Sequence, residues 1–149
     1  LTGCAIFENK GPSAHVNISS AEYLNPNING QAAPIVVTIY QLKSPYIFNQ
    51  ANYHELADNS AKVLANDLID KTTIEVRPNE CKSISIPLSP NTQDIGIMAA
   101  YRDIENSTWH TTEEIDGQKK GKTKIYIALE SRALTATSSN ETTKLWGMF

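Results

Sequence analysis

The chain has 149 residues, of which 40% are hydrophobic and 19% are charged. This length and composition are typical of one folded domain with a single core, and they exclude an intrinsically disordered chain. The formal net charge is −3, so the sequence lacks the strong positive field that nucleic-acid-binding proteins use. No run of about 20 apolar residues occurs, so no segment is expected to span a membrane as a helix.

The first four residues, Leu1-Thr2-Gly3-Cys4, match the bacterial lipobox, in which an apolar residue and small residues precede a cysteine. In that chemistry the chain is cut before the cysteine, and acyl chains such as palmitate are added to its thiol and its new amine. Several acyl chains, at ~0.8 kcal/mol per buried CH₂, anchor a protein firmly. We therefore expect Cys4 to be lipidated, the alternative being an ordinary cysteine near a chance start. Ala5 favours the outer membrane, because sorting retains lipoproteins with Asp there in the inner membrane.

Residues 8–13 are polar and contain a Gly-Pro pair, which is typical of a linker, although a short ordered edge segment also fits. From His15 to Leu24, Val16 and Ile18 first alternate with polar residues as in a half-buried strand. The alternation then slips by one residue, which predicts a β-bulge.

The next stretch consists of turn-forming residues apart from Ile28. Proline fixes φ, and Asn and Gly accept left-handed conformations, so an irregular loop is predicted. Ile28 either folds back onto the end of the domain or contacts a partner. The loop, which is the candidate partner-binding segment, comprises Asn25, Pro26, Asn27, Ile28, Asn29, Gly30, Gln31, Ala32 and Ala33.

Residues 34–42 form the clearest predicted strand, because apolar residues occupy both of its faces. The following stretch changes to a helical period. Asn52 with Glu55 three residues later indicates a capping box and a short helix through Asp58. A second helical or irregular segment is expected around Val63–Leu68. This helical insert is predicted to cover the outer face of the preceding strand.

Alternating apolar residues then predict further strands, separated by turn formers. In Pro78-Asn79, Asn tolerates the positive φ of a type II turn. About eight short strands indicate an all-β, antiparallel, two-sheet β-sandwich over residues 14–149, preceded by a lipobox remnant and linker over residues 1–13. The later strands are expected from Lys71 to Val76, Ile84 to Leu88, Ile95 to Tyr101, Trp109 to Ile115, Ile125 to Leu129 and Ala133 to Ala136, with a tail over residues 138–149.

Successive antiparallel strands alternate in direction, so the first, third and fifth connections lie at the same end of a sandwich. These connections are Asn25–Ala33, Pro78–Glu80 and Asp103–Thr108. The N-terminus enters at the other end, roughly 30 Å away for a strand of about ten residues at ~3.3 Å per residue. The loop that contains Ile28 is thus expected to point away from an anchor at Cys4.

Few residues suggest catalysis. His15, His54 and His110 are scattered, and Asp58 stands where a zinc-protease helix beginning at His54 would need its second histidine. Nucleotide-binding and serine-hydrolase motifs are absent. Cys81 opens a strand, where a small buried side chain is the more common role. The basic loop at Lys119, Lys120 and Lys122 is interpreted as a solubilising surface, with phosphate or lipid binding as the alternative. No enzyme, metal or cofactor is predicted.

Several segments occur together in a particular order and spacing between about Cys4 and Leu129. They are Leu1–Cys4, Leu24-Asn25-Pro26 with Gly30, Pro34 to Val37, Ile39-Tyr40-Gln41-Leu42-Lys43, Phe48, Tyr53, Leu56, Arg77-Pro78-Asn79-Glu80, Ile95-Gly96-Ile97, Ala99-Ala100-Tyr101-Arg102-Asp103 and Trp109. In this order and spacing the chain resembles the type VI secretion lipoprotein family (TssJ). Two departures from the family pattern are Asn79 in place of a turn Gly, and His110 in place of an Arg that commonly follows the Trp.

The resemblance implies a transthyretin-like sandwich and an outer-membrane lipoprotein that faces the periplasm. It implies binding to the periplasmic C-terminal region of the inner-membrane subunit TssM, through the loop that is here Asn25–Ala33.

Two alternatives remain open. A ligand-binding lipoprotein would need Trp109, Tyr101 and Tyr126 to converge on an open face. A hydrolase of the transthyretin-like kind would need the three histidines to cluster.

Overall fold

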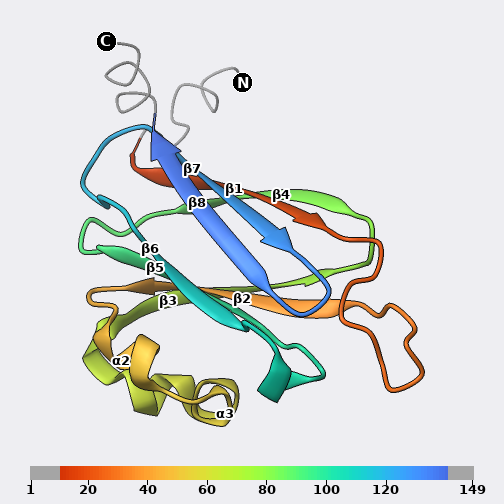
Figure 1. The fold of residues 1–149 in the computed structure, drawn as a ribbon. Helices are drawn as coiled ribbons and strands as arrows, with labels where there is room; N and C mark the ends of the chain where they lie inside the picture. Colours follow the sequence, from red (N-terminus) through yellow and green to blue (C-terminus); the bar gives the residue numbers. More distant parts are fainter. Residues whose placement is uncertain (1–10, 141–149) are drawn as a thin grey trace, which may run out of the picture.

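The computed structural model describes residues 11–140, which form two four-stranded β-sheets packed face to face (Figure 1). The first, which we call the open sheet, has the strand order β4-β1-β7-β8, and the second, the covered sheet, has the order β3-β2-β5-β6. The predicted sandwich and its strand number are confirmed. The strands are β1 (Ser13–Ser20), β2 (Ile35–Leu42), β3 (Leu68–Val76), β4 (Cys81–Pro87), β5 (Asp94–Ala99), β6 (His110–Glu114), β7 (Lys122–Leu129) and β8 (Leu134–Asn140).

Strand direction follows from position in the chain. Odd-numbered strands run one way and even-numbered strands the other, so every neighbouring pair of the covered sheet is antiparallel. In the open sheet, however, the odd strands β1 and β7 are neighbours, and they therefore pair in parallel. The antiparallel expectation thus holds for every pair among these eight strands except this one.

The main core lies between the two sheets. β1 contributes Ala14, Val16 and Ile18, none more than 1% exposed, and they face the apolar side chains of β2 and β5. The predicted β-bulge near the end of β1 is wrong, because the pairing with β7 is continuous to Ser20. The slip in the apolar pattern instead marks the point where the chain leaves the sheet. Leu24 lies in the loop that follows, and its side chain is buried in the core.

A helical insert between β2 and β3 covers the outer face of the covered sheet (Figure 1). It comprises α2 (Tyr46–Gln50), α3 (Tyr53–Leu64) and the 3₁₀ turn η1 (Ala65–Asp67). The capping box of Asn52 and Glu55 is confirmed, with reciprocal hydrogen bonds of 2.8 and 2.9 Å. α3 continues past the predicted end at Asp58, across a non-helical residue at Asn59. The insert builds a second core around Tyr40, Leu42, Phe48, Ala51, Leu56, Leu64 and Met98.

The first and last strands reach slightly further than predicted. At the N-terminal side, Pro12 accepts a hydrogen bond from Leu88 N and Ser13 already belongs to β1. β8 extends through Asn140, so residues 138–140 of the predicted tail are strand. Cys4, the other lipobox residues and the apolar tail lie outside the described residues. Within residues 11–140, no helix has the length and apolar character needed to cross a membrane.

Candidate functional site

Four connections meet at one end of the sandwich, which we call the loop end (Figure 1). They are residues 21–34, 77–80, 100–109 and 130–133. Hydrogen bonds join them: Asn79 N donates to Ala21 O (3.1 Å), and Asn25 N donates to Ser131 O (3.0 Å). The prediction that Asn25–Ala33, Pro78–Glu80 and Asp103–Thr108 share one end is confirmed. The β7–β8 hairpin, which the sequence reasoning did not include, joins them.

Asn25 holds the base of the long loop in place. It is 7% exposed and has φ +47°, a left-handed conformation that Asn adopts more readily than other non-glycine residues. Its Nδ2 donates to Pro34 O (2.9 Å), and its Oδ1 accepts from Arg102 N (2.8 Å). Together with the bond to Ser131, this residue joins its own loop to two other connections, one from each sheet. The loop therefore leaves the domain from a braced base.

The tip of the loop is organised around the side chain of Asn27. Its Oδ1 accepts hydrogen bonds from Asn29 N and Gln31 N, both at 2.9 Å, and its backbone N donates to Gln31 O (2.8 Å). Gly30 takes φ +77°, which allows the chain to reverse. A side-chain oxygen that accepts from nearby backbone N–H groups is the usual way for Asn to stabilise a turn. The tip thus has a defined shape without contact to the core.

The tip presents Ile28 to solvent. Its side chain is 86% exposed, the largest value among the large hydrophobic residues of the described chain, and Asn29 to Ala32 are exposed beside it. The structure therefore excludes one of the two interpretations of Ile28, because the side chain does not fold back onto the end of the sandwich. Contact with a partner stays a prediction. Single exposed hydrophobic residues are common on protein surfaces, so it is the position of Ile28 on a braced loop that makes it a candidate contact.

A cleft of about 330 Å³ lies beside the loop. Its charged residues are Arg102, Asp103 and Arg132, and Arg132 Nε lies 3.3 Å from Asp103 Oδ2. Asn106 Nδ2 also donates to the Asp103 carboxylate, at 3.0 and 3.2 Å. The cleft combines residues of three connections, namely Pro26, Asn27, Ile28, Arg102, Asp103 and Arg132.

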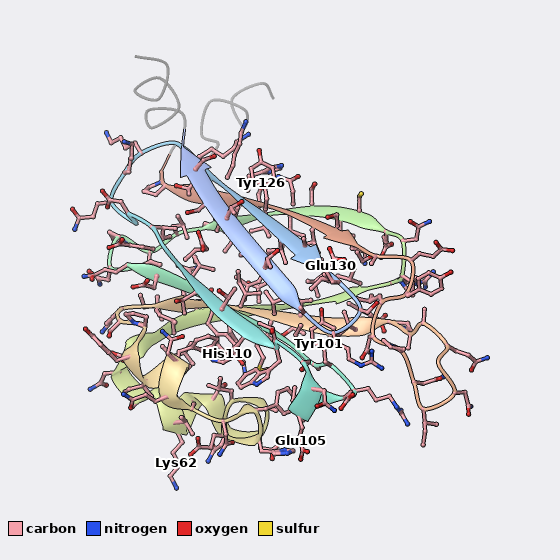
Figure 2. All side chains as sticks on the ribbon, in the orientation of Figure 1. Lys62, Tyr101, Glu105, His110, Tyr126 and Glu130 are labelled. Atoms are coloured by element: carbon pink, nitrogen blue, oxygen red, sulfur yellow. The ribbon has the colours of Figure 1, made fainter. Side chains whose placement is uncertain are left out.

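Tyr101 fixes the two connections that carry these charged residues. It is 3% exposed, and its hydroxyl shares its single hydrogen between Ala133 O (2.7 Å) and Glu130 O (2.9 Å) at the β7–β8 hairpin, where Figure 2 labels Tyr101 and Glu130. Burial, reinforced by the nearby charge of Glu130, raises the pKa of this phenol well above its usual value, so it stays a neutral donor. The relative positions of Arg102 and Arg132 are thus fixed by the bond between the β5–β6 and β7–β8 connections.

The residues weighed for chemistry do not form one site. His15 lies on β1 of the open sheet, whereas His110 packs under the helical insert. Cys81 is exposed, so its expected burial is wrong: its side chain points to the uncovered face of the open sheet. Within residues 11–140, no group of three His, Cys, Asp or Glu side chains could hold a metal ion.

The aromatic residues of the ligand-binding alternative also stay apart. Tyr101 is buried, Trp109 packs against Tyr53, and Tyr126 lies on the open sheet (Figure 2). They do not converge on an open face as a small-ligand site requires.

Comparison with known proteins identifies the family. The sequence model described as "Type VI secretion lipoprotein, VasD, EvfM, TssJ, VC_A0113" matches residues 12–132. The chain belongs to this family of type VI secretion lipoproteins. None of the curated protein sequences that were compared with the chain matches it significantly.

Solved structures agree with this assignment. The T6SS lipoprotein TssJ1 from Pseudomonas aeruginosa is 31% identical, with a TM-score of 0.81 over 87% of this chain and 98% of that one. Serratia marcescens Lip, described as a membrane bound component of the type VI secretion system, is 18% identical, with a TM-score of 0.79 over 84% of this chain and 96% of that one. A chain of a structure described as a type VI membrane complex is 25% identical, with a TM-score of 0.75 over 84% of this chain and 97% of that one.

The sequence reasoning missed Arg132 and the pairing of Asp103 with it. Both could have been found, because the alternation of strand direction that placed three connections at the loop end also places the seventh there. Arg132 lies in that connection.

Proposed function

We propose that this type VI secretion lipoprotein is a non-enzymatic assembly component at the periplasmic face of the outer membrane. Lipid on Cys4 anchors it there, and the loop Asn25–Ala33 binds the periplasmic C-terminal region of TssM. The family assignment supports the secretion role, and a relative was solved as part of a type VI membrane complex. The loop end lies opposite the start of β1, so an anchor at Cys4 leaves the loop free to meet a partner (Figure 1).

The observation that carries the binding assignment is the exposure of Ile28 on a loop braced from below. A preformed loop loses little conformational entropy on binding, and burial of an exposed aliphatic side chain adds hydrophobic free energy. Hot spots of this kind at interfaces cost about 2 kcal/mol or more when they are removed.

The test replaces Ile28 with Asp. We expect Ile28→Asp to weaken binding to the purified TssM C-terminal region by roughly 30-fold or more in calorimetry, as loss of a hot spot implies. Replacement of Asn25–Ala33 by a Gly/Ser linker should abolish binding. Both variants should retain a cooperative unfolding transition.

The matched control is Tyr46→Asp, which removes another exposed hydrophobic residue, 73% exposed on α2. This variant should bind as the unchanged protein does. Unchanged affinity after replacement of the whole loop would overturn the loop assignment.

The anchor is tested separately. The variant Cys4→Ser should leave outer-membrane fractions for the soluble periplasmic fraction, because it cannot be acylated. Retention in the membrane would show that another segment anchors the protein.

A further inference from the structure

We propose that the cleft beside Ile28 is a carboxylate-binding subsite, which receives one Asp or Glu side chain of the protein that docks on the loop. This inference rests on the proposed function and adds the chemistry of the contact. Its basis is the placement of two arginine side chains, Arg102 and Arg132, in one cleft with the exposed tip of the loop.

The charges in the cleft are not balanced. Two arginines, Arg102 and Arg132, line it against one acidic residue, Asp103. Asp103 already accepts from Arg132 Nε and from Asn106. Within residues 11–140, the guanidinium group of Arg102 has no ion pair or hydrogen bond, and Arg132 uses only its Nε. The cleft therefore retains unneutralised positive charge and unused N–H donors.

The chemistry of these donors points to a carboxylate. The planar guanidinium group presents parallel N–H bonds that match the two oxygens of a carboxylate. Asp103 orients Arg132, which reduces the conformational entropy lost on binding. Tyr101 fixes the hairpin that carries Arg132, and Asn25 accepts from the backbone of Arg102. The backbone segments that carry both arginines are thus held by the same contacts that brace the loop.

The surroundings favour a single acidic residue over a generally acidic partner. The connections of the loop end carry more carboxylates than guanidinium groups, and those outside the cleft would repel a run of acidic residues. The partner is therefore expected to present one carboxylate next to an apolar recess that accepts Ile28. The charged residues of these connections are Glu22, Arg77, Glu80, Arg102, Asp103, Glu105, Glu130 and Arg132.

The experiment measures binding of the TssM C-terminal region to the variants Arg102→Gln, Arg132→Gln and the double variant. We expect the double variant to bind at least about tenfold more weakly, since removing one side of a charge pair at an interface has effects of this size or larger. The salt dependence of its Kd should also flatten. The control Lys120→Gln with Lys122→Gln removes the same charge from exposed residues at the opposite end, and it should bind normally.

A further variant separates binding from bracing. If Arg132 served only to hold Asp103, then Asp103→Asn would weaken binding as much as Arg132→Gln does. We expect Asp103→Asn to bind at least as tightly as the unchanged protein, because the Asn side-chain oxygen can still accept from Arg132 Nε while the one carboxylate that lines the cleft is removed. Equal loss in both variants would overturn the inference, as would normal binding by the double arginine variant. If Ile28→Asp still abolished binding in that case, the proposed function would stand without the subsite.

Discussion

The two sheets of the sandwich have the same number of strands but different outer faces. In the covered sheet, β2 is buried on both faces apart from the exposed Val36, because α2 and α3 pack on the side that faces away from the main core. In the open sheet, the outward side chains of β1 are His15, Asn17 and Ser19, and none of them is fully buried. The difference teaches that what covers a strand decides its sequence pattern: largely apolar residues on both faces of β2, and alternation of apolar and polar residues in β1.

The strongest test of this comparison removes a large side chain from each outer face. Phe48 is fully buried between α2 and the covered sheet, with its ring centroid 5.3 Å from that of Tyr40. We expect Phe48→Ala to lower the free energy of unfolding by about 3–5 kcal/mol, as buried aromatic truncations do. Tyr126 is 45% exposed on the open sheet, and Tyr126→Ala should lower the free energy of unfolding by less than about 1 kcal/mol. Urea unfolding measures both, and comparable losses would contradict the comparison.

An intermediate effect is expected when a side chain is added. Gly96 on β5 leaves room for the insert, since a Cβ there would lie 3.0 Å from atoms of Leu42 and Phe48. Gly96→Val should therefore destabilise the protein by about 1–3 kcal/mol through overpacking. The matched change on the open sheet is Ala128→Val, at a half-buried position that lines its shallow outer groove. Ala128→Val should leave the stability of the protein nearly unchanged. A lower melting temperature for Ala128→Val than for Gly96→Val would show that the outer face of the open sheet is packed at least as tightly as that of the covered sheet.

The smallest expected effect concerns pH. His110 lies under the insert, where its ring stacks on Trp109 at 3.9 Å. Burial lowers the pKa of His110 below its ordinary value of 6.5, although a hydrogen bond with the backbone of Asn49 opposes this. The unfolded chain then binds a proton more readily, so the free energy of unfolding falls as the pH drops below about 6.5.

The measurement compares urea unfolding of the unchanged protein and His110→Gln between about pH 7.5 and 5. The variant should lose less stability over this range. Asp94 acts in the opposite direction, because burial and Glu114 raise its pKa, but it is present in both proteins and cancels in the comparison. If the free energy of unfolding falls equally with pH in both proteins, His110 is not the group that causes the loss of stability.

Local patterns predicted much of the fold because they report burial and turn chemistry directly. The alternation in β1 and β7, the capping box at Asn52 and the positive φ of Asn79 all follow from side chains acting on their own backbone or on one face of it. Patterns of this kind cannot show what lies opposite a strand. The slip near Leu24 was therefore interpreted as a bulge, although it marks a loop residue that enters the core.

By itself, the sequence determined the strand count, the helical insert and the placement of three connections at one end, because strand direction alternates along the chain. Only the tertiary structure decided that Ile28 points to solvent and that Arg132 meets Asp103 beside it. Those facts depend on contacts between segments distant in the sequence, such as Asn25 with Ser131 and Tyr101 with Ala133. No local propensity encodes such contacts, since they form only when the two sheets pack together.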